Sequence, residues 1–318
     1  MNMIYRLILL YLWLGLVFHK VTHLERRPEK TAQVGRWLGC RARAGVDADV
    51  ALDLALFAVL GVRAWPMSGV GNDPLGEELK SQIEDWGLPS DLICSVADRE
   101  TGRSLVTVLE GEPNFEVLKD VAWDYIDVPE IWPVECQPAD ALVFGSLSQR
   151  SARNRAVLDV MFVAMPNALK VLDVNLRDAY EDHEQIWALA RSADLVKLND
   201  EEVQALMKTT PTRANAEDCA RSFQRQAGCE TVCVTMGAQG AGLLRCDEWH
   251  WIDAVPVKVR DTVGAGDSFL AGLIYGLLIT QEDATATLRR SATLASFVAS
   301  SDGATPDYEI GEFVAQPG

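Results

Sequence analysis

The sequence predicts an α/β protein built around a mostly parallel sheet. Its 318 residues are 48% apolar, which is typical of a globular chain with one large core. From about residue 141 onward, short apolar runs alternate with amphipathic helical patterns, as they do in βαβ units. Each of these apolar runs ends in a polar or glycine-containing stretch, a common feature of strand ends at a ligand-binding edge.

Upstream of this alternation, turn and capping signals define the elements. They are, in order, a helix over 46–60, a strand over 62–67, a glycine turn over 69–73 and a helix over 74–86. Gly61 and Gly87 end the two helices, because glycine commonly follows a helix C-terminus. Between 93 and 125, β-type runs with turn residues predict a small β insertion or lid.

The second half of the chain supplies the regular alternation. Strands are expected over 141–145, 169–174, 194–198 and 230–236, and helices over 151–164, 184–192, 200–208 and 215–227. Ser151 is expected to cap the first of these helices. Because the carboxyl ends of parallel strands meet at one edge of a sheet, the stretches that follow the four strands are expected to line one cleft.

The N-terminal segment does not fit this pattern. Residues 7–18 are twelve consecutive uncharged, largely apolar residues, preceded by Arg6. A membrane-spanning helix needs about 20 such residues. A signal peptide needs a small-residue cleavage site, which 18–22 does not offer. Contact with a membrane is therefore not favoured. A buried strand or helix of the fold and a start region foreign to this domain both stay open.

The charge of the chain restricts its partners. With 29 Lys and Arg against 46 Asp and Glu, the formal net charge is −17. Nucleic-acid binding depends on clusters of Lys and Arg that displace counterions, and none is visible, so a nucleic-acid partner is not expected. An acidic protein can still bind a nucleotide, provided that a helix N-terminus and Mg²⁺ meet the phosphates.

The seven cysteines and four histidines carry no metal or nucleophile pattern. The cysteines are odd in number and scattered, with no C-x-x-C pair, which predicts reduced thiols and a cytoplasmic location. The histidines are equally dispersed. Neither a zinc site nor a histidine-based nucleophile triad is therefore expected.

The segment 260–269 carries the most chemical information. Small residues at 264–266 let backbone N–H groups approach a ligand, and the helix that begins there points its positive end at the same place. Asp267 lies in the first helical turn, where a carboxylate could accept a proton from an attacking hydroxyl. An ordinary helix start, with Asp267 complementing the dipole, explains these residues equally well.

The stretch Asp-Thr-Val-Gly-Ala-Gly-Asp-Ser-Phe-x-Ala-Gly, which begins at Asp261, resembles the C-terminal signature of the ribokinase-like (PfkB-type) carbohydrate kinases. Five further segments resemble motifs of that family in the expected order; they are 69–76, 144–147, 173–177, 197–202 and 234–241. Two of them, 144–147 and the D-x-N-x-R of 173–177, resemble its fructokinase-like branch. The resemblance covers roughly residues 45–318.

This resemblance implies a three-layer α/β/α ribokinase-like fold with a mostly parallel central sheet. It also implies that residues 45–318 form a sugar-kinase domain, with a small β lid from roughly 93–125. Residues 1–44 are then a divergent N-terminal segment of uncertain structure. Dimerisation through the lid is expected by analogy with the family.

The same resemblance implies an ATP-dependent kinase that phosphorylates a sugar hydroxyl. Asp267 would be the catalytic base, and the backbone of Gly264, Ala265 and Gly266 would form the anion hole. Asn199 and Glu202 would organise Mg²⁺ and the phosphates through water, although Glu202 alone is most simply a solvated helix residue. Residues bordering the nucleotide would be Thr235, Gly237 and Gly240, for which a plain strand-end turn is the alternative.

The implied sugar and potassium sites involve more scattered residues. Contacts to the sugar would come from Gly45, Asp49, Asp173, Asn175 and Arg177. Arg177 could instead form a surface ion pair. A potassium ion is a further expectation, at Asp261, Val263 and Gly303.

The sugar-binding segment departs from the family pattern. Ala44 replaces the first glycine of a Gly-Gly pair, and Asp49 stands where asparagine is expected. Asparagine donates and accepts hydrogen bonds, whereas ionised aspartate only accepts. A fructokinase-like activity is the leading hypothesis, with ribose, 2-keto-3-deoxygluconate or a nucleoside as other substrates. The alternative is a catalytically silent nucleotide- or sugar-binding protein of the same fold.

Overall fold

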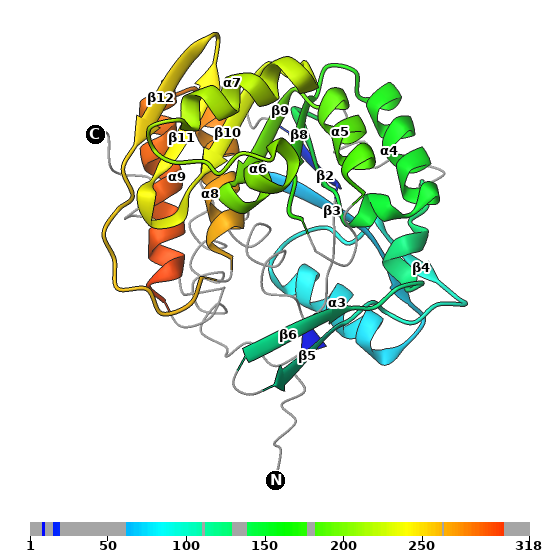
Figure 1. Cartoon of the computed structure of the whole chain (residues 1–318). Coiled ribbons are helices and arrows are strands. Elements are labelled where there is room, and N and C mark those ends of the chain that lie inside the picture. Colours follow the sequence, from blue (N-terminus) through cyan, green and yellow to red (C-terminus); the bar gives the residue numbers. More distant parts are fainter. Residues whose placement is uncertain are drawn as a thin grey trace.

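A nine-stranded sheet forms the middle of the molecule (Figure 1). The computed structural model describes residues 8–9, 15–19, 62–109, 112–128, 139–176, 182–262 and 264–301. In spatial order the strands are β12 (Glu248–Ile252), β11 (Ala241–Arg245), β10 (Thr231–Thr235), β9 (Leu195–Asn199), β8 (Leu169–Asp173), β7 (Ala141–Gly145), β2 (Gly15–His19), β3 (Arg63–Gly71) and β4 (Ile93–Val96).

The sheet is mostly parallel, as the alternating pattern predicts. Strands β7, β8, β9 and β10 pair in parallel, and so do β3 and β4. The strands β11 and β12 follow as antiparallel hairpins at one end. Because β7, β8, β9 and β10 are neighbours, their carboxyl ends share one edge, where the predicted site residues lie.

Helices cover both faces of the sheet, which gives the three layers. The helices are α3 (Pro74–Asp85), α4 (Ala152–Ala164), α5 (His183–Ser192), α6 (Asp200–Met207), α7 (Ala216–Ala227), α8 (Ala265–Ile274) and α9 (Ala284–Ala299). Strand alternation divides the core: Val171 and Leu195 pack with α3, α8 and α9, whereas Leu172 and Val196 pack with α5, α6 and α7. The fold is therefore a three-layer α/β/α architecture, as expected.

The apolar N-terminal run contributes a strand. Strand β2 lies between β3 and β7 and is antiparallel to both. Of the alternatives left open for 7–18, a strand of the fold is what the structure shows for 15–19. In the described part of the chain, none of the helices has the length and apolar character to cross a bilayer.

The predicted β insertion is narrower than 93–125. Strand β4 belongs to the large sheet, because it pairs in parallel with β3. The hairpin of β5 (Ser104–Leu109) and β6 (Glu112–Val117) forms a separate sheet with β1 (Ile8–Leu9). This β5–β6 hairpin lies apart from the central sheet in Figure 1.

The predicted glycine turn at 69–73 is wrong, because Gly69 and Gly71 belong to β3. Close backbone contacts explain the glycines. A Cβ at Gly69 would lie 2.4 Å from the carbonyl oxygen of Ala122, and one at Gly71 would lie 2.5 Å from that of Arg99. The turn follows at Asp73, which caps α3 by accepting a hydrogen bond from the Gly76 N–H at 2.8 Å.

Most other predicted boundaries agree with the structure within about two residues, a normal uncertainty for helix and strand ends. The helix predicted over 46–60 lies outside the described residues. Ser151 does occupy the position before α4, but its side chain makes no capping bond. Instead, the Ser151 hydroxyl donates to the carbonyl of Asp124 at 2.6 Å. A tertiary contact has thus replaced the expected local one.

Candidate active site

The start of α8 has the geometry of an anion site. Gly264 precedes the helix with a φ of 78°, a left-handed conformation that favours glycine. Its carbonyl accepts hydrogen bonds from both the N–H and the hydroxyl of Ser268, at 2.9 and 2.8 Å. The N–H of Ala265 donates to Thr262 at 3.2 Å. Asp267 is half-buried in the first turn, beside the positive end of the helix.

A buried ion pair lies at the carboxyl ends of β8 and β9. Asp173 and Lys197 are register partners on these neighbouring strands. The ammonium of Lys197 donates to Oδ1 of Asp173 at 2.8 Å, and the two side chains are only 7% and 5% exposed. Burial this complete requires that each charge be paired, because an isolated ion would lose its hydration without compensation.

Asn199 and Glu202 form a reciprocal cap at the start of α6. The Asn199 side chain accepts from the N–H of Glu202 at 2.8 Å, and the Glu202 carboxylate accepts from the N–H of Asn199 at 2.7 Å. The other Glu202 oxygen accepts from the N–H of Leu176, beyond β8, at 3.0 Å. Glu202 is therefore buried, and the interpretation of this residue as a solvated helix position is wrong.

Charges in this region perturb one another. Burial, followed by the nearby carboxylate of Asp173, raises the pKa of Glu202 to about 7. Burial acts against the charged form of Lys197, but Asp173, Glu202 and Asp267 together raise its pKa above the ordinary lysine value. The charges of three carboxyl groups, including that of the predicted catalytic base, therefore act on Lys197.

The helix start and the strand ends meet at Lys197. A Cβ at Gly266 would lie 3.7 Å from the Lys197 ammonium nitrogen. The structure thereby brings Gly266 and Asp267 together with Asp173 and Glu202, as expected for one site. Lys197 itself was not singled out as a functional residue from the sequence. Its signal was a lysine inside the otherwise apolar run that forms β9.

The predicted nucleotide residues lie at the end of β10 and in the turn after it. Thr235 pairs with Asn199, and its hydroxyl donates to the Leu198 carbonyl at 3.4 Å. Gly237 and Gly240 have φ values of 48° and 123°. A Cβ at Gly240 would lie 2.1 Å from the Ile252 carbonyl oxygen, so packing alone requires glycine there. Thr235 is the member of this group that lies beside Asn199.

Several predicted residues cannot be placed. Gly45, Asp49, Arg177, Val263 and Gly303 lie outside the described residues. Asn175, which follows β8, is half-buried with a φ of 43°. Asp261 lies near the end of α9, where its N–H donates to the Ala299 carbonyl at 3.4 Å. The sugar contacts and the potassium site therefore stay predictions.

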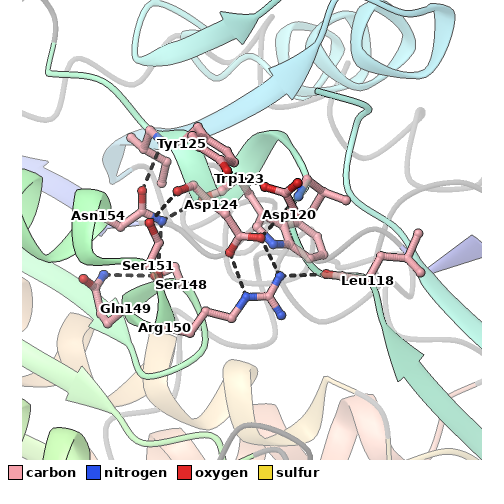
Figure 2. Close-up of polar contacts among 12 residues, drawn as sticks. Leu118, Asp120, Trp123, Asp124, Tyr125, Ser148, Gln149, Arg150, Ser151 and Asn154 are labelled. Carbon is pink, nitrogen blue, oxygen red and sulfur yellow. Dashed lines mark hydrogen bonds and ion pairs between the residues drawn. The ribbon is translucent and has the colours of Figure 1, made fainter. Parts of the chain in front are cut away.

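A second polar cluster, which the sequence did not predict, joins the segment that follows the β5–β6 hairpin to the start of α4 (Figure 2). We call Asp124, Arg150, Ser151 and Asn154 the hairpin-base cluster. Arg150 donates from two nitrogens to the two carboxylate oxygens of Asp124, both at 2.7 Å, and to the carbonyl of Leu118 at 2.6 Å. Asn154 donates to the carbonyls of Trp123 and Ser148 and accepts from the N–H of Ile126.

The site's chemistry suits magnesium bound through phosphates rather than a protein cage. Among the described residues there is no group of three or more His, Cys, Asp and Glu side chains arranged to hold a metal. Mg²⁺ usually keeps several waters and takes one or two carboxylates together with substrate phosphates. Glu202 at the start of α6 and Asp267 at the start of α8 are carboxyl groups that could serve such a loosely held ion.

Known proteins similar to this chain are sugar kinases. A model described as pfkB family carbohydrate kinase matches residues 54–310. An uncharacterized sugar kinase of Pyrococcus horikoshii is 29% identical over 242 residues, covering 74% of this chain and 73% of that protein. Its crystal structure in complex with ATP has a TM-score of 0.65 at 25% identity, covering 84% and 88% of the two chains.

Two further relatives have named substrates. An aminoimidazole riboside kinase of Salmonella typhimurium is 28% identical over 258 residues, covering 79% of this chain and 76% of that protein. A fructokinase of Escherichia coli is 26% identical over 260 residues, covering 77% and 80%. These relatives span most of the chain but act on different acceptors, so they do not define one substrate.

Proposed function

The chain belongs to the PfkB family of carbohydrate kinases, and we propose that it transfers the γ-phosphoryl group of ATP to a hydroxyl of fructose or of a closely related sugar. One observation carries the proposal: the start of α8 places Asp267 beside a helix N-terminus and next to the charged strand ends. A proton acceptor beside a phosphate-binding helix start is what phosphoryl transfer requires, because that chemistry depends on positioning and charge stabilisation.

In the proposed reaction, Asp267 accepts the proton of the sugar hydroxyl as the hydroxyl oxygen attacks the γ-phosphorus. The new O–P bond forms while the bond from phosphorus to the bridging oxygen breaks, and ADP leaves with that oxygen. Backbone N–H groups of Gly264, Ala265 and Gly266 donate to the oxygens of the transferred group. For this contact, the N–H of Ala265 gives up its hydrogen bond to the carbonyl of Thr262.

Magnesium fits the carboxyl-rich strand ends and, when bound, would neutralise charge on the β- and γ-phosphates. Asn199 and Glu202 are the residues we propose to orient it through water. Glu202 can do so only with lone pairs left over from its bonds to the N–H groups of Leu176 and Asn199. We also propose potassium near Asp261, Val263 and Gly303.

Fructose is proposed because 144–147 and 173–177 resemble the fructokinase-like branch, and because a relative is a fructokinase. The riboside kinase among the relatives makes a nucleoside-like acceptor the second candidate. A silent binding protein is less favoured, because Asp267 and the helix start keep the arrangement that transfer needs. We further propose a homodimer through the β5–β6 hairpin and a cytoplasmic location.

The test is release of ADP from ATP and Mg²⁺ across fructose, ribose, 2-keto-3-deoxygluconate and nucleosides, with and without K⁺. We expect fructose to give the highest kcat/KM, and K⁺ to raise it. Identification of the product by mass spectrometry separates transfer from ATP hydrolysis. If folded protein phosphorylates no member of the panel, the proposed function is wrong. Light scattering on the same preparation tests the dimer.

A further inference from the structure

Lys197 occupies a position where the fold calls for an apolar side chain. Its neighbours in β9, Leu195, Val196 and Leu198, are all buried hydrophobic residues. Strand alternation places Lys197 on the same face as Leu195, which is the face covered by α8. The lysine side chain is only 7% exposed, so its charge is taken from water into this layer.

The ammonium of Lys197 is held between the sheet and the start of α8. On the sheet side it donates to Asp173 at 2.8 Å. On the helix side it lies 3.7 Å from the place where a Cβ of Gly266 would be, and Asp267 and Glu202 are close enough to stabilise its charge. An alanine Cβ at 266 would therefore be in ordinary van der Waals contact with the ammonium.

We propose that Lys197 is a positioning residue for phosphoryl transfer, holding a fixed positive charge beneath the first turn of α8 where the transferred group arrives. This inference rests on the proposed function. Asp173 then acts through Lys197, by fixing the ammonium, instead of contacting the sugar. Asp173 thereby receives a role different from the sugar contact expected from the sequence, and Lys197 receives a role that was not expected.

The charge composition of the region explains the need for such a cation. The Lys197 ammonium pairs with Asp173, the charges of Glu202 and Asp267 also act on it, and a nucleotide phosphate would bring further negative charge to the same region. Preorganised positive charge in a site shielded from water stabilises developing negative charge far better than it would in bulk water. Without Lys197, the phosphates would approach uncompensated carboxylates.

A purely structural ion pair explains the arrangement less well. Strands β8 and β9 are already joined by their ladder, and the N–H of Val174 donates to the Lys197 carbonyl at 3.2 Å. Buried ion pairs are seldom net stabilisers, because desolvation offsets their attraction. Apolar residues at both positions would hold the strands equally well. Strand pairing alone therefore does not explain why a charged lysine occupies position 197.

The decisive comparison is Lys197→Met with Lys170→Met, a lysine on β8 that packs over the Phe162 ring. For Lys197→Met we expect kcat to fall about 100-fold, the effect of removing one stabilising group from an oxyanion site, while KM for the sugar changes less than about threefold. Lys170→Met should leave both unchanged. A kcat within about threefold of wild type in Lys197→Met overturns the proposal.

Nucleotide binding gives a readout that needs no turnover. Calorimetry with Mg²⁺ should show about tenfold weaker binding of the non-hydrolysable ATP analogue AMP-PNP to Lys197→Met, with ADP binding changed less than about threefold. An equal loss for both nucleotides, or none, contradicts a charge placed for the γ-phosphoryl group. If the wild-type protein phosphorylates no sugar, the proposed function is wrong. The difference between AMP-PNP and ADP binding still tests whether Lys197 interacts with the γ-phosphoryl group.

Asp173→Asn and the double variant Lys197→Met/Asp173→Asn separate positioning from stability. Removing both partners leaves no stranded charge, so the double variant should regain thermal stability relative to Lys197→Met. Its kcat should remain low, and Asp173→Asn alone should lower kcat more than it raises KM for the sugar. If the double variant regains kcat as well as thermal stability, the proposal is wrong. It is also wrong if Asp173→Asn raises KM for the sugar and leaves kcat unchanged.

Discussion

Two ion pairs of the described residues, Asp124–Arg150 and Asp173–Lys197, are largely shielded from solvent, and they differ in their surroundings. Arg150 in the hairpin-base cluster meets one carboxylate with matched geometry, and the backbone carbonyl of Leu118 takes a further bond (Figure 2). Lys197 at the strand ends pairs with Asp173, is also influenced by the charges of Glu202 and Asp267, and lies near the start of α8. The first cluster is balanced in charge, whereas the second has an excess of carboxyl groups.

This difference indicates a structural role for the Asp124–Arg150 pair and a functional role for the cluster around Lys197. A balanced pair with backbone partners fixes two segments relative to each other, here the end of the β5–β6 hairpin and the start of α4. In the second cluster, burial and then the nearby Asp173 carboxylate raise the pKa of Glu202, and groups with perturbed pKa values concentrate at functional sites. Substitutions in the first cluster should therefore affect stability, and those in the second should affect turnover.

Asp267→Asn is expected to have the largest effect. Asparagine keeps the shape of the side chain but cannot accept the hydroxyl proton, so kcat should fall about 1,000-fold with little change in ATP affinity. Steady-state kinetics and calorimetry measure the two quantities. Near-normal turnover of Asp267→Asn would show that Asp267 is not the catalytic base. It would also contradict the assignment of catalysis to the cluster around Lys197.

Arg150→Met should act on stability alone. Removing one partner of a buried pair leaves the Asp124 carboxylate uncompensated, which costs about 4 kcal/mol of the free energy of unfolding. The matched control is Arg153→Met, because Arg153 pairs with Asp127 at the exposed surface and should cost less than about 1 kcal/mol. Urea unfolding checks both. Equal losses in the two variants would contradict the distinction between buried and exposed pairs.

Glu202 should make the unfolding free energy depend on pH. Its pKa is about 7 in the folded protein, above the unfolded value of 4.5, so the folded state holds the proton more tightly. The resulting stabilisation is complete below pH 4.5 and is lost as the pH rises through 7, by about 3 kcal/mol at most. Glu202→Gln should lack this component. Denaturant unfolding of wild type and Glu202→Gln from pH 4 to 8 in EDTA tests this pH dependence. If the unfolding free energies of the two proteins change with pH in parallel, Glu202 is not the source.

Ser151→Ala should have the smallest effect. The lost hydrogen bond to the Asp124 carbonyl is worth about 1 kcal/mol, with no change in kcat. Urea unfolding and the sugar-kinase assay measure the two quantities. A fall in kcat at saturating substrates would show that the hairpin-base cluster also reaches the chemistry.

Local pattern predicted the regular part of the fold well. Short apolar runs and amphipathic helical patterns are properties of neighbouring residues, so β7 to β10 and α4 to α7 could be located within about two residues. The turn predicted over 69–73 was wrong because its glycines allow close contacts with the backbone of Ala122 and Arg99, which are distant in sequence. Ser151 failed as a cap for the same reason, since Asp124 captures its hydroxyl.

The sequence by itself determined the α/β class and the four neighbouring strand ends, because these depend on local spacing, and a long motif predicted a catalytic role for 264–267. Only the tertiary structure decided that Gly15–His19 forms a strand within the large sheet. It likewise showed that Lys197 joins Asp173 to the start of α8. Strand pairing and the placement of a buried charge depend on groups that meet only after folding, which no spacing along one chain records.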